Sequence, residues 1–376
     1  MNILKMLEYM SVAKYNIKRQ IYIYQTVMFI DGSVFIMKIA FYDTKPYDKI
    51  WFEPIAKEKG FEILFLEEKL NKHTASFAKG CEAVCIFVND SADEATINEL
   101  KKHGVKGILL RCAGFNNVDV KVAEVNGIAV MRVPSYSPRA VAEYALGLLL
   151  AVNRKIHRAY VRTRDFNYSI NGLMGMDLCG KTIGIVGTGK IGQAMMSVIR
   201  GLDMNVLLYD PYPIKELIEK DESAIKKWGE NMEYVSLDEL LEKSDVISLH
   251  CPLSKTTHHM INKEHINMMK DGVILINTSR GGLINTQDLL DALAEKKFAG
   301  VGLDVYEEED AYFFEDMSDE LITDDDLVRL TSYRNVILTS HQAFFTKEAM
   351  CEIARTTLEN AEQLEKGENL QNLVTL

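Results

Sequence analysis

Between residues 37 and 133, short apolar runs alternate with amphipathic segments. The apolar runs predict strands at 38–42, 61–66, 83–88, 107–111 and 128–133. The segments between them predict helices near 48–59, 93–103 and 118–126. Regular alternation of strand and helix is typical of βαβ units, which build a parallel sheet. We therefore expect a first α/β domain in this part of the chain.

A different pattern follows this first series. Ser137 and Pro138 are typical of the cap and first turn of a helix. The chain from there to about Tyr168 contains no further proline and only one glycine, Gly147. The sequence therefore predicts one long helix over residues 138–168.

A second alternating series begins at Lys181. Its apolar runs predict strands at 182–187, 205–209, 245–249, 272–277, 299–304 and 336–339. Helices are predicted near 190–202, 236–243, 263–270 and 286–297, with a last helix over 346–366. The acid-rich stretch 315–326 predicts a solvated loop.

These patterns predict an α/β protein of two Rossmann-like or flavodoxin-like parallel-sheet domains with a cleft between them. We expect the last helix to return to the first domain. Residues 37–136 plus 341–376 would then form a discontinuous substrate domain, and residues 137–340 a dinucleotide-binding domain. Residues 1–36 precede the first clearly predicted strand, and we expect the folded protein to begin at Met37. Residues 1–36 would then be a poorly ordered extension, or the result of a start site upstream of Met37.

The segment Ile-Gly-Ile-Val-Gly-Thr-Gly-Lys-Ile-Gly at 183–192 predicts a dinucleotide site. Its glycines follow a strand and open a helix: Gly187 permits the tight turn, Gly189 the approach of a pyrophosphate, and Gly192 close packing of helix on strand. The next strand ends at Asp210, where a carboxylate can accept hydrogen bonds from ribose hydroxyls. That carboxylate would repel a 2′-phosphate, so NAD is expected rather than NADP.

Three later strands of this series end in residues that suit catalysis. Arg280 follows strand 272–277, an acidic run from Asp304 to Glu309 follows strand 299–304, and His341 follows strand 336–339. Ligands of open α/β sheets bind beyond the carboxyl ends of the strands. Arginine can hold a carboxylate through two hydrogen bonds, and histidine can act as a general acid near neutral pH.

His250 also follows a strand and is a rival to His341. We favour His341 because its strand is the last before the return to the other domain, and we expect His250 to flank the cofactor. The other histidines lie in helical or polar stretches and are expected at the surface.

Composition limits the possible partners and the compartment. The net charge of −11 argues against nucleic acid and anionic membranes as partners. The sequence has no apolar run long enough to span a bilayer, a length of about 18 residues or more. Six scattered cysteines without paired metal-ligand spacing are expected to be buried thiols in a reducing compartment, so we expect a cytoplasmic protein without a metal.

Several of these segments together resemble the D-isomer-specific 2-hydroxyacid dehydrogenases, most closely the D-lactate dehydrogenases of fermenting bacteria. The resemblance runs from Met37 to near the C-terminus, and residues 1–36 have no counterpart in it. Its most specific parts are residues 111–117, 187–192, 277–281, 304–309 and 341–344.

The resemblance implies a role for particular residues. Arg280 matches the arginine that binds the substrate carboxylate, His341 the proton donor, and Glu309 the acid paired with it. Glu307 and Glu308 lie beside Glu309, so the choice among the three acids stays open here. The implied pocket residues are Ala113, Gly114, Tyr136 and Phe344. The implied cofactor residues are Gly187, Gly189, Lys190, Ile191, Gly192, Asp210, Cys251, Pro252, Thr257, Thr278, Ser279 and Asp304.

The implied activity is NAD-dependent, reversible reduction of pyruvate to D-lactate by a homodimer or homotetramer. Two alternatives remain at this point. One is another enzyme of the family, of the hydroxyisocaproate or phosphoglycerate type. The other is a non-catalytic NAD-sensing corepressor on the same scaffold, because a fold alone does not determine function.

Overall fold

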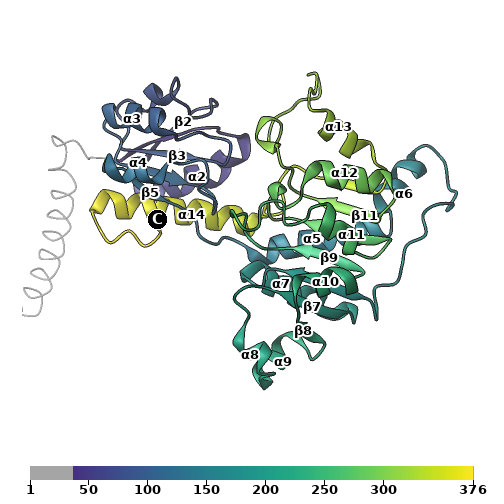
Figure 1. The fold of residues 1–376 in the computed structure, drawn as a ribbon. Coiled ribbons are helices and arrows are strands. Elements are labelled where there is room, and N and C mark those ends of the chain that lie inside the picture. The colour runs from purple at the N-terminus through teal and green to yellow at the C-terminus, as the bar shows by residue number, and fades with distance from the viewer. Residues whose placement is uncertain (1–36, 376) are drawn as a thin grey trace, which may run out of the picture. The chain divides into compact units, whose positions relative to one another are not determined.

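The computed structural model describes residues 37–375, so the expectation for residues 1–36 lies outside the described part of the chain. The described chain divides into two compact units (Figure 1). Residues 37–134 and 354–375 form the first unit, and residues 135–353 form the second.

The first unit contains a five-stranded parallel sheet in the order β2-β1-β3-β4-β5. Its strands are β1 (Lys38–Phe41), β2 (Glu62–Phe65), β3 (Ala83–Ile86), β4 (Gly107–Leu110) and β5 (Ala129–Met131). Its main helices are α2 (Pro46–Lys59), α3 (Glu94–Lys102) and α4 (Val120–Val125), with the 3₁₀ turn η1 (Ala75–Ala78). Every residue of β3 and β4 is buried, which is why these strands appear as continuous apolar runs.

The C-terminal segment completes the first unit. Helix α14 (Lys347–Lys366) belongs to this unit from Ala354 onward. The side chain of Asn360, on this helix, donates a hydrogen bond of 3.0 Å to the carbonyl of Arg132, and Leu373 forms an antiparallel bridge with Met131. The last helix therefore returns to the first sheet.

A buried arginine lies at the carboxyl end of β4. The Arg111 side chain donates a 2.9 Å hydrogen bond to the carbonyl of Asp43, and its Nε lies 3.8 Å from the Asp48 carboxylate. Its guanidinium also lies 4.4 Å from the ring centre of Phe41 and 4.9 Å from that of Phe87. Burial by itself would lower the pKa of Arg111, but the negative charges around it, Asp48 foremost, outweigh burial and raise it.

Asp90 is a second buried charge near this arginine. Burial raises the pKa of Asp90 to about 6, although Arg111 and two backbone hydrogen bonds act in the opposite direction. Those bonds come from the N–H groups of Leu70 and Phe87, at 2.5 and 2.6 Å. Arg111 therefore compensates carboxylates that have little access to water.

We predict that Arg111→Met lowers the free energy of unfolding by about 3–5 kcal/mol, because it leaves buried carboxylates without their counter-charge. Urea denaturation measures this change. The control is Arg139→Met, at an exposed arginine paired with Glu143, which should change stability by less than about 0.5 kcal/mol. Equal stability of the two variants would contradict a structural role for the Arg111 charge.

The second unit contains a seven-stranded parallel sheet in the order β12-β11-β10-β9-β6-β7-β8. The strands are β6 (Thr182–Val186), β7 (Asn205–Tyr209), β8 (Met232–Tyr234), β9 (Val246–Leu249), β10 (Val273–Asn277), β11 (Phe298–Leu303) and β12 (Val336–Leu338). From β6 the chain builds the sheet in one direction to β8, and β9 then starts on the other side of β6. Ligands bind at such a reversal, beyond the carboxyl ends of the strands. The predicted class, two parallel-sheet α/β domains, is confirmed.

The helices of this unit precede β6 or connect successive strands of the sheet (Figure 1). They are α5 (Pro138–Asn153), α6 (Ile156–Arg164), α7 (Lys190–Ile199), α8 (Lys215–Ile218), α9 (Glu222–Trp228), α10 (Leu237–Lys243), α11 (Lys263–Met268), α12 (Thr286–Ala294) and α13 (Asp325–Ser332). Added β-carbons at Gly300 and Gly302 would lie 3.0–3.1 Å from Val152 and Leu148 of α5, so these glycines let α5 pack closely on β11. Among the helices within residues 37–375, none has the length and apolar character needed to cross a membrane.

The single helix predicted over 138–168 is wrong. It is interrupted after Asn153, because Lys155 adopts a left-handed conformation with φ of 52°. The buried Asn153 side chain donates a hydrogen bond to the carbonyl of Met176 and accepts one from its N–H, at 2.9 and 3.0 Å. These bonds tie the end of α5 to a distant segment, a constraint that helix propensity does not contain.

Three further differences concern short or polar segments. Strand β8 and helices α8 and α9 were not predicted, because each is too short to show a clear hydrophobic period. The acid-rich stretch is not all solvated loop, since Asp324 accepts a 2.9 Å hydrogen bond from the N–H of Leu327 and thereby caps α13. Residues 341–353, predicted with the first domain, lie in the second unit.

Candidate active site

The glycine-rich turn between β6 and α7 has the geometry that a dinucleotide site requires. Gly187 has φ of 96°, and a β-carbon there would lie 2.6 Å from the backbone nitrogen of Cys251. A β-carbon at Gly192 would lie 2.0 Å from the carbonyl oxygen of Gly187. Gly189 has open space around it and caps α7, whose first residues are Lys190 and Ile191. The backbone can therefore approach an anion at the start of α7.

Asp210 lies beside this turn, at the end of β7. One of its carboxylate oxygens accepts hydrogen bonds from the N–H and hydroxyl of Thr188, at 2.7 and 3.2 Å. The other accepts a 2.8 Å hydrogen bond from the N–H of Tyr212. The carboxylate is thus held next to the glycine-rich turn, where the sequence predicts the ribose hydroxyls.

The ends of β9 and β10 form the next part of this edge. The hydroxyl of Ser279 donates a 2.6 Å hydrogen bond to the carbonyl of Cys251, and that of Thr257 donates one of 2.7 Å to the carbonyl of Pro252. The buried Thr278 hydroxyl oxygen has no hydrogen-bond partner among the described residues. A polar atom buried without a partner at this edge fits a site that a polar ligand completes. The residues predicted to hold NAD are therefore compatible with it.

His250 is buried between these loops. Its Nε2 lies 2.9 Å from the Ser248 hydroxyl, and its Nδ1 has no hydrogen-bond partner among residues 37–375. Burial lowers the pKa of His250 to about 4, so the imidazole is neutral at physiological pH. A neutral ring suits the expected place beside the cofactor better than a role as proton donor.

Arg280 follows β10 on a loop that lies directly against the turn after β11. The Asn277 side chain donates a 2.8 Å hydrogen bond to the carbonyl of Arg280, and the guanidinium donates one of 2.7 Å to the carbonyl of Ser279. A β-carbon at Gly281 would lie 2.0 Å from the carbonyl carbon of Tyr306. The two loops therefore meet backbone to backbone, which only glycine permits.

His341 and Glu309 form a hydrogen-bonded pair. The Nδ1 atom of His341 lies 2.5 Å from Oε1 of Glu309, whose Oε2 accepts a 2.8 Å hydrogen bond from the N–H of Tyr306. Both side chains are largely buried. Glu308 is exposed and Glu307 pairs with His259 instead. Of the three adjacent acids, the structure brings Glu309 to His341, and this pairing leaves Nε2 of the imidazole for a substrate.

Asp304 holds the loop that carries His341. Its fully buried carboxylate accepts hydrogen bonds from the Thr339 hydroxyl and from the N–H groups of Gln342 and Ala343, at 2.7, 2.9 and 2.7 Å. Its carbonyl accepts a 2.7 Å hydrogen bond from the N–H of His341. Burial raises the pKa of Asp304, although these hydrogen bonds oppose the shift. The sequence placed Asp304 near the nicotinamide; in the structure, its carboxylate is used to shape the His341 loop.

This network also explains why residues 341–353 lie in the second unit. The backbone immediately after β12 is tied to the end of β11 through Asp304, so the chain cannot leave the second sheet at residue 340. The Gln342 side chain adds a 2.8 Å hydrogen bond to the hydroxyl of Tyr144 on α5. Tyr144 was not predicted, because nothing in its helical surroundings distinguishes it from other tyrosines.

The four predicted pocket residues belong to different units. Tyr136 and Phe344, in the second unit, form an edge-to-face pair with ring centres 5.8 Å apart. Ala113 and Gly114 lie in the first unit, where the carbonyl of Ala113 accepts a 2.9 Å hydrogen bond from Arg132. Of the remaining histidines, His73 and His258 are exposed as predicted, whereas the prediction is wrong for four that are partly buried: His103, His157, His259 and His265.

These features define a dinucleotide-dependent enzyme, and comparisons with known proteins identify its family. Residues 146–343 match the family model of the D-isomer specific 2-hydroxyacid dehydrogenase, NAD binding domain. The chain belongs to the D-isomer-specific 2-hydroxyacid dehydrogenase family, and it is an NAD-dependent enzyme of that family.

Similar proteins cover nearly the whole described chain. A D-lactate dehydrogenase of Escherichia coli is 49% identical over 336 residues, which are 89% of this chain and 99% of that protein. The apo-structure of D-lactate dehydrogenase from Escherichia coli has a TM-score of 0.80 at 47% identity and covers 90% of this chain and 100% of its own. The pyruvate reductase of Chlamydomonas reinhardtii has a TM-score of 0.82 at 42% identity, with coverage of 90% and 98%.

We predict that Asp304→Asn lowers kcat about 10²-fold, because the amide replaces one acceptor with a donor and displaces the imidazole. Steady-state kinetics at saturating NADH measures the effect, and circular dichroism checks the fold. If Asp304 acted mainly on the cofactor, the variant would instead raise KM for NADH and keep kcat. The matched control, Asp319→Asn at an exposed position in the acid-rich stretch, should leave both constants unchanged.

Proposed function

We propose that this enzyme catalyses the reversible reduction of pyruvate to D-lactate. The observation that carries the proposal is the hydrogen-bonded His341–Glu309 pair, on loops adjoining the Arg280 loop in an NAD-binding unit. The names of the similar proteins from Escherichia coli and Chlamydomonas reinhardtii support the choice of substrate. The D configuration of the product is supported by the family, whose name specifies that isomer.

The cofactor would be held along the carboxyl edge of the second sheet. Backbone N–H groups around Gly189, Lys190 and Ile191 would bind the pyrophosphate, and the Asp210 carboxylate would accept hydrogen bonds from the adenosine ribose. Cys251, Pro252 and Thr257 would hold the adenosine part, and Thr278 and Ser279 the nicotinamide part. When bound, NADH supplies the hydride for the carbonyl carbon.

The protein residues supply binding, orientation and the proton. The Arg280 guanidinium binds the carboxylate of the 2-oxoacid through two hydrogen bonds. The protonated imidazole of His341 donates a hydrogen bond from Nε2 to the ketone oxygen and transfers this proton as the oxygen gains negative charge. The Glu309 carboxylate, bound to Nδ1, compensates the imidazolium charge and fixes the ring. Tyr136 and Phe344, which lie in the same unit as these residues, border the methyl side of the substrate.

We expect pyruvate to have the highest kcat/KM among 2-oxoacids tested with NADH. The panel contains pyruvate, 2-oxoisocaproate and 3-phosphohydroxypyruvate, which separate the alternatives within the family. NADH oxidation is followed by absorbance, and chiral chromatography identifies the product. A preference for either of the larger substrates, formation of L-lactate, or no turnover with any of them would contradict the proposal.

We expect Glu309→Gln to lower the rate of pyruvate reduction by about 10²-fold, in the range typical of acid–base catalysis. Steady-state kinetics at saturating NADH and pyruvate measures the effect. Glu308→Gln is the control, since that neighbouring acid is exposed, and it should keep the rate of the unmodified enzyme.

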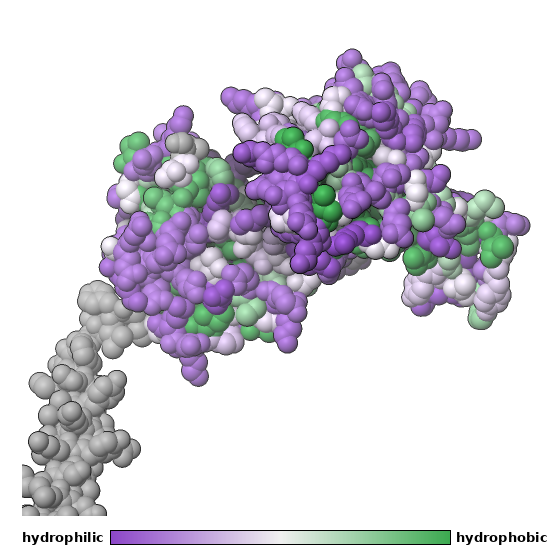
Figure 2. Space-filling model, turned by 90° about the horizontal axis from the view of Figure 1, so that it is seen from below, coloured by the Kyte–Doolittle hydropathy of each residue, from purple (hydrophilic) through white to green (hydrophobic). Residues whose placement is uncertain are grey.

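We further propose that the chain forms a homodimer or homotetramer through α6 and the segment after it. This region exposes Ile156, Tyr160, Val161, Phe166, Tyr168, Ile170 and Met174. Figure 2 shows hydrophobic atoms gathered at the end of the second unit where this segment lies. So many exposed apolar side chains in one segment are typical of a protein interface.

We predict that the double variant Phe166→Ser/Ile170→Ser shifts the protein toward monomer, because it removes apolar surface from the proposed interface. Sedimentation equilibrium measures the mass. The control is Tyr212→Ser, at a highly exposed aromatic residue outside this segment, which should leave the mass unchanged. A monomeric unmodified protein, or a double variant of unchanged mass, would argue against this interface.

A further inference from the structure

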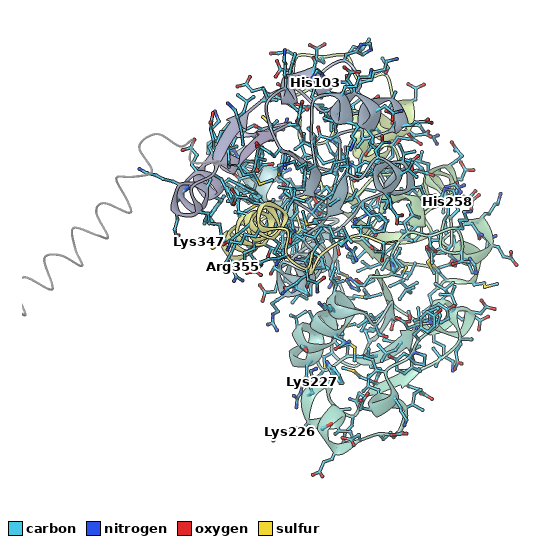
Figure 3. The ribbon with its side chains drawn as sticks, turned by 90° about the vertical axis from the view of Figure 1, so that its left-hand side faces the viewer. His103, Lys226, Lys227, His258, Lys347 and Arg355 are labelled. Atoms are coloured by element: carbon cyan, nitrogen blue, oxygen red, sulfur yellow. The ribbon has the colours of Figure 1, made fainter. Side chains whose placement is uncertain are left out.

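Two adjacent histidines face a glutamate on the loops after β9 and β11. The His258 and His259 rings are stacked, with ring centres 3.8 Å apart and planes inclined by 27°. Oε1 of Glu307 is hydrogen-bonded to Nε2 of His259 and lies 4.0 Å from Nε2 of His258. One nitrogen from each histidine and one carboxylate oxygen all lie within 4.8 Å of one another. His258 is half exposed and is labelled in Figure 3 on the green part of the ribbon.

The Glu307 carboxylate is oriented by hydrogen bonds from Thr286 to its second oxygen. Its Oε2 accepts a 2.9 Å hydrogen bond from the hydroxyl of Thr286, at the start of α12, and a longer one from the N–H of the same residue. Burial by itself would raise the pKa of Glu307, but its hydrogen bonds to His259 and Thr286 outweigh burial and lower it. The carboxylate is therefore an oriented anion, with its other oxygen directed at the two imidazoles.

The histidine side is held by the backbone. The N–H of His259 donates a 2.8 Å hydrogen bond to the carbonyl of Gly282, and His259 has a left-handed φ of 51°. This conformation turns the two neighbouring side chains to the same side, where they stack. A structural hydrogen bond to Glu307 would account for the position of His259. It does not account for the position of His258, whose Nε2 lies near the same carboxylate oxygen.

We propose that His258, His259 and Glu307 bind a divalent transition-metal ion of the zinc class. Two imidazole nitrogens and a carboxylate oxygen are typical ligands of Zn²⁺, with water in a fourth position. Mg²⁺ and Ca²⁺ prefer sites made entirely of oxygen ligands and do not fit this set. The ion takes the place of the proton shared by His259 and Glu307, as is usual when metals bind ionisable ligands.

Small adjustments complete the coordination. The His259 and Glu307 ligand atoms move apart to admit the ion, and the exposed His258 side chain moves toward it. Nδ1 of His259 lies 3.3 Å from the side-chain nitrogen of Asn285. When the ion occupies Nε2, the imidazole carries its proton on Nδ1, so the Asn285 amide shifts away from this contact. The site joins the loop after β9 to the turn after β11, and binding stabilises the folded second unit.

The experiment titrates the full-length protein with Co²⁺ and, separately, with Zn²⁺. Visible d–d absorption reports Co²⁺ bound to nitrogen and oxygen ligands, calorimetry gives the stoichiometry and Kd for Zn²⁺, and thermal denaturation gives the shift in Tm. The variant is His258→Gln, which removes the exposed ligand and keeps the hydrogen bond between His259 and Glu307. His73→Gln, at an exposed histidine in the first unit, is the matched control.

We expect one ion per chain, a Tm that rises with Zn²⁺, and a Kd that is at least about tenfold weaker in His258→Gln but unchanged in His73→Gln. At the same Co²⁺ concentration the d–d absorption should be weaker in His258→Gln than in the control, and Mg²⁺ should not compete. Without metal, both variants should have the Tm and pyruvate reductase rate of the unmodified enzyme. The proposal is overturned if neither ion binds, or if His258→Gln binds both ions as tightly as the control does. Neither outcome depends on which 2-oxoacid the enzyme reduces.

Discussion

The carboxylate of Asp304 is the constraint on which the active site depends. It joins the end of β11 to the segment just after β12, because it accepts hydrogen bonds from Thr339, Gln342 and Ala343. The left-handed backbone of His341, with φ of 53°, is maintained by this network and directs the imidazole to Glu309. An acidic residue that need not contact substrate thus determines where His341, the proposed proton donor, lies.

The parallel sheet of the second unit brings the parts of the site together. Because all its strands run in one direction, the loops after β6, β9, β10, β11 and β12 emerge at one edge. Neighbouring loops are then joined by hydrogen bonds: the N–H of Asp304 donates to the carbonyl of Asn277, and the Ser279 hydroxyl donates to the carbonyl of Cys251. The cofactor turn and the catalytic pair are therefore built on one rigid scaffold, which is what hydride transfer between two bound molecules requires.

Most of the fold could be predicted because buried parallel strands are continuous apolar runs, as in β3 and β9. The glycine-rich turn was equally clear, since Gly187 has a left-handed φ of 96° and Gly192 packs against the carbonyl of Gly187, five residues earlier. What the sequence could not reveal depends on distant contacts. The helix break at Lys155 is accompanied by hydrogen bonds between Asn153 and Met176. The pairing of His341 with Glu309 rather than with Glu307 depends on the direction in which the turn after β11 points each successive side chain. The pairing of His259 with Glu307 spans 48 residues and has no local signal.

The close backbone contact between Gly281 and Tyr306 has a consequence for how the substrate preference of this enzyme could evolve. Because the loops of Arg280 and Glu309 touch through backbone atoms, the spacing between the anion-binding group and the proton relay is independent of any variable side chain. The aromatic pair Tyr136 and Phe344 is built from side chains alone. In the site proposed above, substitutions there would reshape the space for the substrate's hydrocarbon portion without altering the reaction geometry. Chemistry and selectivity are thus encoded by separate sets of atoms, which allows one scaffold to diversify toward different 2-oxoacids.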